Sequence, residues 1–266
     1  EYAPEELFTI VKHGLKFTGM PAWPAQDRDD EVWAMVAFLL VYPELDGPGY
    51  RALAYGDAEP EAGGVVPLAG LEGTEGPPDV FASCVRCHGA DGMGRGLGAF
   101  PILAGQKLEY QVSALEAFRR GDRRSGVMQP IAASLTDEQI VGLSAYYASL
   151  PSPLADRDAA PSSYAATSIE RGREIAAKGI PSKVVPACRH CHDPGGASTR
   201  DHYPRLGGQY EDYLRLQLRL FKDDQRGGSP YAHLMRHAVR GLDEPAMRDV
   251  AAYFASLRRE AAPEVR

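Results

Sequence analysis

The chain has 266 residues, of which 44% are hydrophobic and 24% charged, a composition typical of a globular protein with room for about two domains. No apolar run approaches the ~18 residues of a membrane span, so no transmembrane segment is predicted in this chain. The net charge of −7 argues against a nucleic-acid partner, because phosphate binding relies on clustered Lys and Arg. Four cysteines are too few for a disulfide scaffold.

Residues 1–42 carry many apolar side chains. The start lacks the basic residues and apolar core of a secretory signal, so we expect either a processed form or a piece of a longer protein. Five aromatic side chains are expected to be buried, because a large exposed apolar patch is unusual on a monomer: Phe8, Phe17, Trp23, Trp33 and Phe38.

Two segments are predicted to be linkers. Residues 43–79 are rich in Gly and Pro and show no apolar periodicity, which is typical of a linker or a surface loop. A shorter connector is expected over residues 152–167. The segments that these linkers delimit, 80–151 and 168–260, are therefore predicted to be two separate domains.

Each of these two segments contains the pattern Cys-x-x-Cys-His. The pairs are Cys84/Cys87, followed by His88, and Cys188/Cys191, followed by His192. This is the pattern of c-type haem attachment. Two thiols on one turn can each add to a haem vinyl group, and the next residue then faces the iron. His88 and His192 are accordingly predicted to be iron ligands.

Three other interpretations of the cysteine pairs are weaker. A thioredoxin-like redox motif needs a βαβ context that neither pair has. A four-cysteine zinc site would have to close a loop of about a hundred residues. Two structural disulfides are compatible with an oxidising compartment. The last two leave both histidines unexplained.

An internal repeat indicates the sixth ligand of each iron. The repeat aligns Phe100-Pro101-Ile102-Leu103-Ala104-Gly105-Gln106 with Tyr203-Pro204-Arg205-Leu206-Gly207-Gly208-Gln209. In the same alignment Met128 and Met235 are at equivalent positions. Methionine opposite histidine raises the potential of a haem and suits electron transfer. A bis-histidine haem stays open in the second unit, because His233 and His237 flank Met235.

The remaining pattern is helical. Middle helices are predicted over 108–118 and 213–221. The Thr136-Asp137-Glu138 sequence predicts the start of a helix that ends before Pro151, and Asp243-Glu244-Pro245 starts the equivalent helix. Since no strand pattern competes with these helices, the predicted fold class is all-α.

These motifs, in this order in both halves, resemble the tandem dihaem class I cytochromes of the cytochrome c4 family. The resemblance covers residues 80–258. It implies two haem domains, each a few helices around a covalently bound haem, in an electron carrier of the periplasm or the outer face of the cytoplasmic membrane. It also implies that the carbonyls of Pro101 and Pro204 accept the N–H of the histidine ligands, which would fix the ring orientation.

Residues 1–42 depart from that two-domain pattern. The spacing from Met20 to Met128 nearly equals that from Met128 to Met235, so this segment aligns as the later half of a third unit. The Gly19-Met20-Pro21-Ala22-Trp23 string also resembles single-domain class I cytochromes, in which this methionine binds iron. Two accounts stay open. A preceding segment of about 60 residues would make the protein trihaem with Met20 as a ligand, which is the favoured account; otherwise the segment is a haem-free remnant that packs its helix on the second unit.

Arginines precede both later methionines. Arg119, Arg120, Arg123 and Arg124 precede Met128, and Arg226 precedes Met235. Arg123 and Arg226 are the candidates for pairing with haem propionates, for which a rigid guanidinium is suited, although solvated surface charge is an equal alternative.

The predicted function is outer-sphere electron transfer, without catalysis by this chain. The donor would be a quinol-oxidising complex or a dehydrogenase, and the acceptor a terminal oxidase or reductase. The alternatives are a cytochrome subunit of a periplasmic dehydrogenase complex and a dihaem peroxidase, which would need an open iron position. The acidic chain would dock on basic patches of redox partners.

Overall fold

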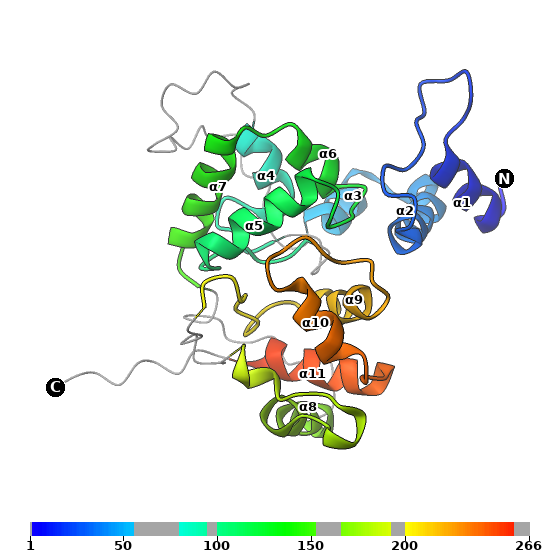
Figure 1. Cartoon of the computed structure of the whole chain (residues 1–266). Helices are drawn as coiled ribbons and strands as arrows, with labels where there is room; N and C mark the ends of the chain where they lie inside the picture. Colours follow the sequence, from blue (N-terminus) through cyan, green and yellow to red (C-terminus); the bar gives the residue numbers. More distant parts are fainter. Residues whose placement is uncertain (1, 56–79, 95–99, 153–165, 193–199, 258–266) are drawn as a thin grey trace.

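The computed structural model describes residues 2–55, 80–94, 100–152, 166–192 and 200–257, and within these ranges it is helical and has no β-strand (Figure 1). The predicted all-α fold class is therefore confirmed. The α-helices are α1 (Pro4–His13), α2 (Asp29–Val41), α3 (Gly47–Tyr55), α4 (Val80–His88), α5 (Leu108–Arg119), α6 (Met128–Ala133), α7 (Asp137–Ser149), α8 (Ala166–Lys178), α9 (Glu211–Lys222), α10 (Ala232–Val239) and α11 (Glu244–Ser256). Three short 3-10 helices are η1 (Tyr42–Glu44), η2 (Pro181–Lys183) and η3 (Cys188–His190).

The helices form two domains and an N-terminal segment. The first domain contains α4 to α7, and the second contains α8 to α11 (Figure 1). In the first domain α5 packs against α6 and α7. In the second, α11 packs against α8 and α9, and Gly172 lets α8 approach α11 so closely that a Cβ there would overlap the backbone of Asp249.

The predicted helix starts are confirmed. Thr136 caps α7 through a reciprocal pair of hydrogen bonds. The backbone N–H of Gln139 donates to Thr136 Oγ1 (3.2 Å), and the side-chain oxygen of Gln139 accepts from the backbone N–H of Thr136 (3.0 Å). Asp243 caps α11 by accepting from the Ala246 N–H at 3.0 Å, with Pro245 in the first turn. The middle helices α5 and α9 also cover their predicted ranges.

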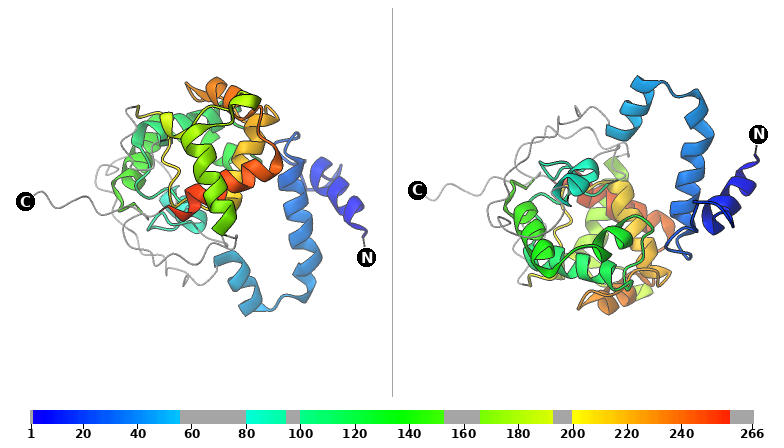
Figure 2. Two further views of the ribbon diagram at one scale, coloured as in Figure 1. Left: turned by 90° about the horizontal axis from the view of Figure 1, so that it is seen from below. Right: turned by 90° about the horizontal axis from the view of Figure 1, so that it is seen from above.

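The N-terminal segment, α1 to α3, stands to one side of the two domains (Figures 1 and 2). Phe8 of α1 stacks on Trp33 of α2 with ring centroids 4.6 Å apart. The prediction that these aromatic side chains are buried is wrong for Trp33, which is exposed, and for Phe17, whose relative exposure is 105%. The other three, Phe8, Trp23 and Phe38, are half-buried. The reason is that two helices and a loop offer only one apolar contact face, so side chains on the other faces stay in water.

One predicted linker contains a helix. α3 lies within residues 43–79, where no helix was predicted; residues 56–79 lie outside the described ranges. Asp46 Oδ1 accepts from the Gly49 N–H at 2.7 Å, and Pro48 lies in the first turn, where a missing N–H costs nothing. These two features start the helix despite the high Gly and Pro content. Of the second predicted connector, residues 153–165 lie outside the described ranges, and α8 begins at Ala166.

No helix in the described part of the chain combines the length and apolarity that crossing a membrane requires.

Candidate haem sites

A cavity of about 660 Å³ lies between the two domains, and both contribute to its walls. Most of the residues predicted from the sequence as haem contacts line it: Cys84, Cys87, His88, Pro101, Arg123, Met128, Cys191, His192, Pro204, Arg226 and Met235. Cys188 packs against the core cluster of the second domain, which includes Leu214 and Phe254. The fold therefore brings together two sets of residues that are separated by about a hundred positions in the sequence.

The cysteine motifs lie on tight turns. Cys84 and Cys87 lie on α4, whereas Cys188 starts η3 and Cys191 follows its last residue. None of the four cysteines forms a disulfide. Burial raises the pKa of the Cys84 and Cys188 thiols to about 11, with a further contribution from the neighbouring cysteine of each pair. In the described ranges no three His, Cys, Asp or Glu side chains come together to hold a metal ion, so the four-cysteine zinc interpretation is not supported.

Both histidines of the motifs have a defined ring orientation. His88 Nδ1 lies 3.0 Å from the Pro101 carbonyl, and His192 Nδ1 lies 2.9 Å from the Pro204 carbonyl. A carbonyl only accepts, so Nδ1 carries the proton in each ring and Nε2 keeps its lone pair. Burial lowers the pKa of both imidazoles, more than the carbonyl bond raises it, so both are neutral at pH 7. A neutral ring with a free Nε2 is the form that binds iron.

The two later methionines line the cavity as well. Met128 is the first residue of α6, and Met235 lies on α10 against the apolar cluster around Val239. His233 and His237 are exposed and do not line the cavity. The geometry thus favours methionine over a second histidine in the second domain.

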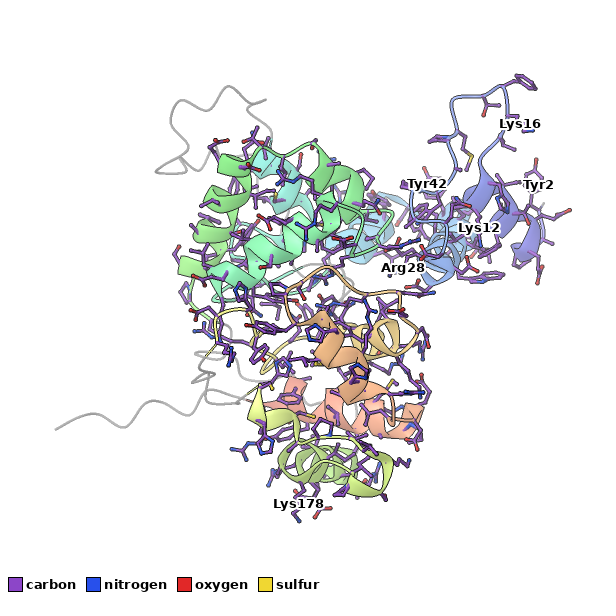
Figure 3. The ribbon with its side chains drawn as sticks, in the orientation of Figure 1. Tyr2, Lys12, Lys16, Arg28, Tyr42 and Lys178 are labelled. Atoms are coloured by element: carbon purple, nitrogen blue, oxygen red, sulfur yellow. The ribbon has the colours of Figure 1, made fainter. Side chains whose placement is uncertain are left out.

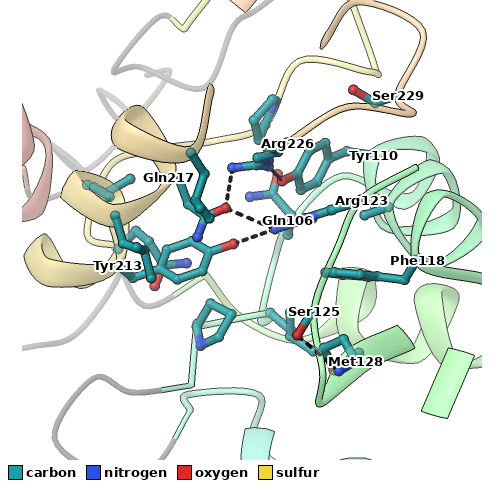
Figure 4. A pocket seen from close by; sticks show the side chains of 18 of the residues that line it. Gln106, Tyr110, Phe118, Arg123, Ser125, Met128, Tyr213, Gln217, Arg226 and Ser229 are labelled. Carbon is teal, nitrogen blue, oxygen red and sulfur yellow. Dashed lines mark hydrogen bonds between the residues drawn. The ribbon is translucent and has the colours of Figure 1, made fainter. Parts of the chain in front are cut away.

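Arg123 and Arg226 meet at the centre of the cavity (Figure 4). Arg226 donates to the Tyr110 hydroxyl at 2.8 Å, and Arg123 donates to the Tyr213 hydroxyl at 3.0 Å, so each arginine bonds a tyrosine of the other domain. Gln217 Oε1 accepts from Arg226 at 2.7 Å. Each guanidinium also lies 4.4 Å from a ring of its own domain, Phe118 or Phe221.

Neither of these guanidiniums has a carboxylate partner among the described residues. Arg226 is 8% exposed. Burial, together with the charge of Arg123, lowers its pKa. By contrast, the exposed Arg120 and Arg124 are paired with Asp122 and Asp27, as solvated surface charges are. A buried guanidinium beside a half-buried one, neither with a carboxylate partner, is costly, so the cavity is suited to an anionic group, and haem propionates fit it.

Two glutamines that the sequence analysis did not assign join the domains beside this cavity. Gln106 Nε2 donates to the Arg205 carbonyl and Gln106 Oε1 accepts from the Arg205 N–H, both at 2.9 Å. Gln209 makes the same pair of bonds with the Ile102 backbone, both at 3.0 Å. Repetition of the Pro-x-x-x-Gly-Gln string was the signal that could have revealed this role.

Met20 lies apart from this cavity. It sits in the loop between α1 and α2 and is 36% exposed. It does not line the cavity between the domains. The hydrogen bonds of the N-terminal segment go chiefly to the first domain, through Arg28 and Glu31. One bond reaches the second domain, where Gln225 donates to the Asp27 carbonyl, whereas the haem-free account expected packing mainly on that unit.

Comparison with protein-family models gives two matches. Residues 78–151 match the family described as cytochrome c. Residues 1–39 match the family described as cytochrome c oxidase, cbb3-type, subunit III. The N-terminal segment therefore resembles part of a cytochrome family different from the one that matches the first domain.

Individual proteins extend the similarity over both domains. The chain is 37% identical to a "thiosulfate dehydrogenase electron acceptor" of Stutzerimonas stutzeri, over 66% of this chain and 79% of that protein. It is 33% identical to a cytochrome c4 of Thiocapsa roseopersicina, over 65% of this chain and 86% of that protein. Among solved structures, the thiosulfate dehydrogenase TsdBA of Marichromatium purpuratum matches with a TM-score of 0.58 and 38% identity, over 66% of this chain and 36% of that one.

These relatives are named as electron carriers, which confirms an electron-transfer protein that is not itself an enzyme. The fold, the paired motifs and the relatives agree, and this chain belongs to the family of dihaem class I cytochromes related to cytochrome c4.

Proposed function

We propose that this chain accepts electrons from a thiosulfate-oxidising dehydrogenase and passes them through two haem c groups to a terminal oxidase or reductase. The observation that carries the proposal is the cavity between the domains, which is lined by two histidine–methionine sets and by two arginines without carboxylate partners. Two relatives at 37% and 36% identity bear the name thiosulfate dehydrogenase electron acceptor, which supports this class of donor.

The roles of the individual residues follow from their positions. Covalent attachment is assigned to Cys84, Cys87, Cys188 and Cys191, and iron coordination to His88, Met128, His192 and Met235. When bound, haem supplies an iron that takes up and releases one electron. The Pro101 and Pro204 carbonyls hold the imidazoles in place. If Met128 and Met235 fill the coordination positions that the histidines leave, none would be open to a peroxide, which argues against the peroxidase alternative.

Arg123 and Arg226 are proposed to bind the haem propionates. A carboxylate in the cavity would supply the counter-charge that the described residues do not provide. Because the two guanidiniums meet between the domains, they can serve both haems. The arginines would thereby hold the propionates of both haems at the junction of the domains.

The donor is tested by reduction of the oxidised protein. We expect a catalytic amount of thiosulfate dehydrogenase, supplied with thiosulfate, to reduce both haems. Reduction is measured by the appearance of the absorbance bands of ferrous haem c. The controls omit the enzyme or replace it with a quinol-oxidising complex. Reduction by the quinol-oxidising complex alone would contradict the proposed donor while leaving the electron-carrier role intact. Stable co-purification with the dehydrogenase would favour the alternative of a subunit in a permanent complex.

Met20 is proposed as the ligand of a third haem. The match of residues 1–39 to a cytochrome family supports this, as does the exposure of Leu15, Phe17 and Met20 on one loop. The cysteine motif for that haem would have to come from outside the printed sequence. Haem quantification and intact mass of the protein from its native source decide the matter: two haems per chain would contradict the proposal.

The proposed location is the periplasm or the outer face of the cytoplasmic membrane. Haem c is attached to proteins outside the cytoplasm, and four half-buried cysteines in two Cys-x-x-Cys-His motifs are suited to that attachment. Cell fractionation with detection of covalent haem would test it, and a cytoplasmic haem-bearing chain would contradict it.

A further inference from the structure

The N-terminal segment binds the loop that leads into α6. Glu31, in the first turn of α2, receives donors from both sides: Ser125 Oγ at 2.8 Å, the Gly126 N–H at 2.6 Å and Trp23 Nε1 at 3.0 Å. It also pairs with Arg28 at 3.1 Å. Its side chain is only 14% exposed. One carboxylate of the N-terminal segment thus joins two residues of the first domain.

Arg28 makes a second link to the same loop. Its Nη1 donates to the Arg124 carbonyl at 2.6 Å, while its Nε and Nη2 bond the two oxygens of Asp30 at 2.8 and 2.7 Å. Figure 3 shows Arg28 on the side of α2 that faces the two domains. Arg124 in turn pairs with Asp27 at 2.9 Å. Several bonds, most of them involving a charged group, therefore fix residues 124–126 to the N-terminal segment.

These contacts continue to Met128. Ser125 Oγ donates to Glu31 and accepts from the Met128 N–H at 3.2 Å and the Val127 N–H at 3.3 Å. Glu31 is therefore two hydrogen bonds away from the backbone of the proposed iron ligand. The Trp23 indole also lies so close to Gly126 that a Cβ there would overlap it. The loop cannot move away from the cavity without breaking these contacts.

The second domain lacks this support. The segment reaches it where Gln225 Nε2 donates to the Asp27 carbonyl at 3.0 Å, ten positions before Met235. In the described ranges, no hydrogen bond joins residues 2–55 to residues 229–235. Met235 lies in the middle of α10 and depends on the helix and on the apolar cluster beside it.

We propose that Glu31, acting through Ser125, is a positioning residue that keeps Met128 on the iron of the first haem. The inference rests on the proposed role of Met128. A thioether is a weak ligand, and its loop must open locally before another ligand can take its place. Contacts that raise the free energy of this opening slow the exchange. The N-terminal segment thereby makes the two haems differ in how readily they exchange methionine.

The test is displacement of methionine by imidazole in the oxidised full-length holoprotein. In Glu31→Gln one side-chain oxygen can still accept a hydrogen bond. The other is replaced by an NH₂ group, which cannot accept the hydrogen bonds that this oxygen accepted. We expect displacement at the first haem to accelerate at least about tenfold, since a hydrogen bond to a charged group is comparable to the free energy that changes a rate tenfold. Displacement at the second haem should not change. Ser125→Ala should act in the same direction.

A readout that does not involve haem accompanies this measurement. Amide hydrogen exchange of residues 126–129 should become faster in Glu31→Gln, because the Gly126 N–H loses its carboxylate acceptor. The matched control is Glu44→Gln, which removes the charge of an exposed glutamate on η1. It should leave both displacement phases and the amide exchange unchanged.

Met128→Ala assigns the displacement phases. It should abolish the phase of the first haem and leave that of the second. If Glu31→Gln and Ser125→Ala both keep the wild-type rates, the positioning role is wrong while the Met128 assignment stands. If Met128→Ala leaves both phases intact, the proposed ligand itself is wrong.

Discussion

In the first domain the Cys84–His88 motif lies within α4, whereas in the second the motif starting at Cys188 lies on a 3-10 turn that the chain reaches after leaving α8. The approach to the methionine differs too. Met128 follows Arg123 by five positions, but Met235 follows Arg226 by nine. The longer loop of the second domain contacts the first domain, because Arg120 donates a hydrogen bond to the Gly228 carbonyl at 3.0 Å.

The comparison shows where two copies of one motif can diverge. The residues next to the cavity are repeated almost one for one, down to an arginine over a phenylalanine ring at 4.4 Å in each domain. The loops behind them are supported by different neighbours. Differences in potential and ligand exchange between the two haems are therefore expected to originate in these supporting contacts and not in the ligand types.

The largest effect is expected from removing a methionine ligand. In Met128→Ala the haem should stay covalently attached, while the potential of the first haem falls by about 0.1 V or more, a fraction of the ~0.8 V that axial ligands span. Redox titration measures this. Met235→Ala should act on the second haem alone. A single variant that shifts both potentials equally would show that the domains are not independent.

The next largest effect concerns the junction of the domains. Gln209→Leu leaves the Ile102 N–H and carbonyl without partners in a buried place, at a cost of about 1–3 kcal/mol. Denaturant unfolding of the holoprotein should show this loss. Gln106→Leu should cost a similar amount, because the Arg205 backbone loses the equivalent pair of bonds. Unequal costs would show that the junction is not as symmetric as its hydrogen bonds.

A smaller effect is expected at the shared arginines. In Arg226→Gln one positive charge leaves the cavity, so the ferric state becomes easier to form and the potentials of both haems should fall. The expected shift is on the order of tens of millivolts, where ~59 mV is a tenfold change for one electron. A shift confined to the second haem would mean that Arg226 serves its own domain only. Arg124→Gln, at an exposed and paired residue, is the control.

The smallest expected effect is a pH dependence of stability that arises in the second domain only. Glu211 takes the place that Leu108 holds in the first domain, and burial raises its pKa to about 7, with a further contribution from Asp212. At pH values below the pKa of Glu211 in the unfolded chain, this carboxyl is protonated in both the folded and the unfolded state. Between that pKa and pH 7 the folded state binds more protons, so the free energy of unfolding falls as the pH rises. Glu211→Leu should therefore raise the melting temperature more at pH 8 than at pH 5. An equal gain at both pH values would contradict the raised pKa.

The sequence predicted the fold class and the helices near the cavity, because helix caps and 3.6-residue periodicity are local. The pairing of His88 with Pro101 came from the family resemblance, and the structure has this contact. The aromatic residues of the N-terminal segment were predicted wrongly, since the composition of a segment does not reveal which surface is available to cover it. α3 was missed because Gly and Pro in a first turn are compatible with a helix.

By itself, the sequence determined the repeat and the two Cys-x-x-Cys-His motifs, and it predicted the types of iron ligand, because these patterns depend on residues close together in the chain. Only the tertiary structure showed that Arg123 and Arg226 line one cavity without pairing with a carboxylate of the described residues, and that Glu31 reaches the loop before Met128. These contacts join residues about a hundred positions apart, and their partners are chosen by packing of whole domains. A local sequence pattern does not specify which distant side chains will contact a buried charged group. These contacts are therefore known only from the fold.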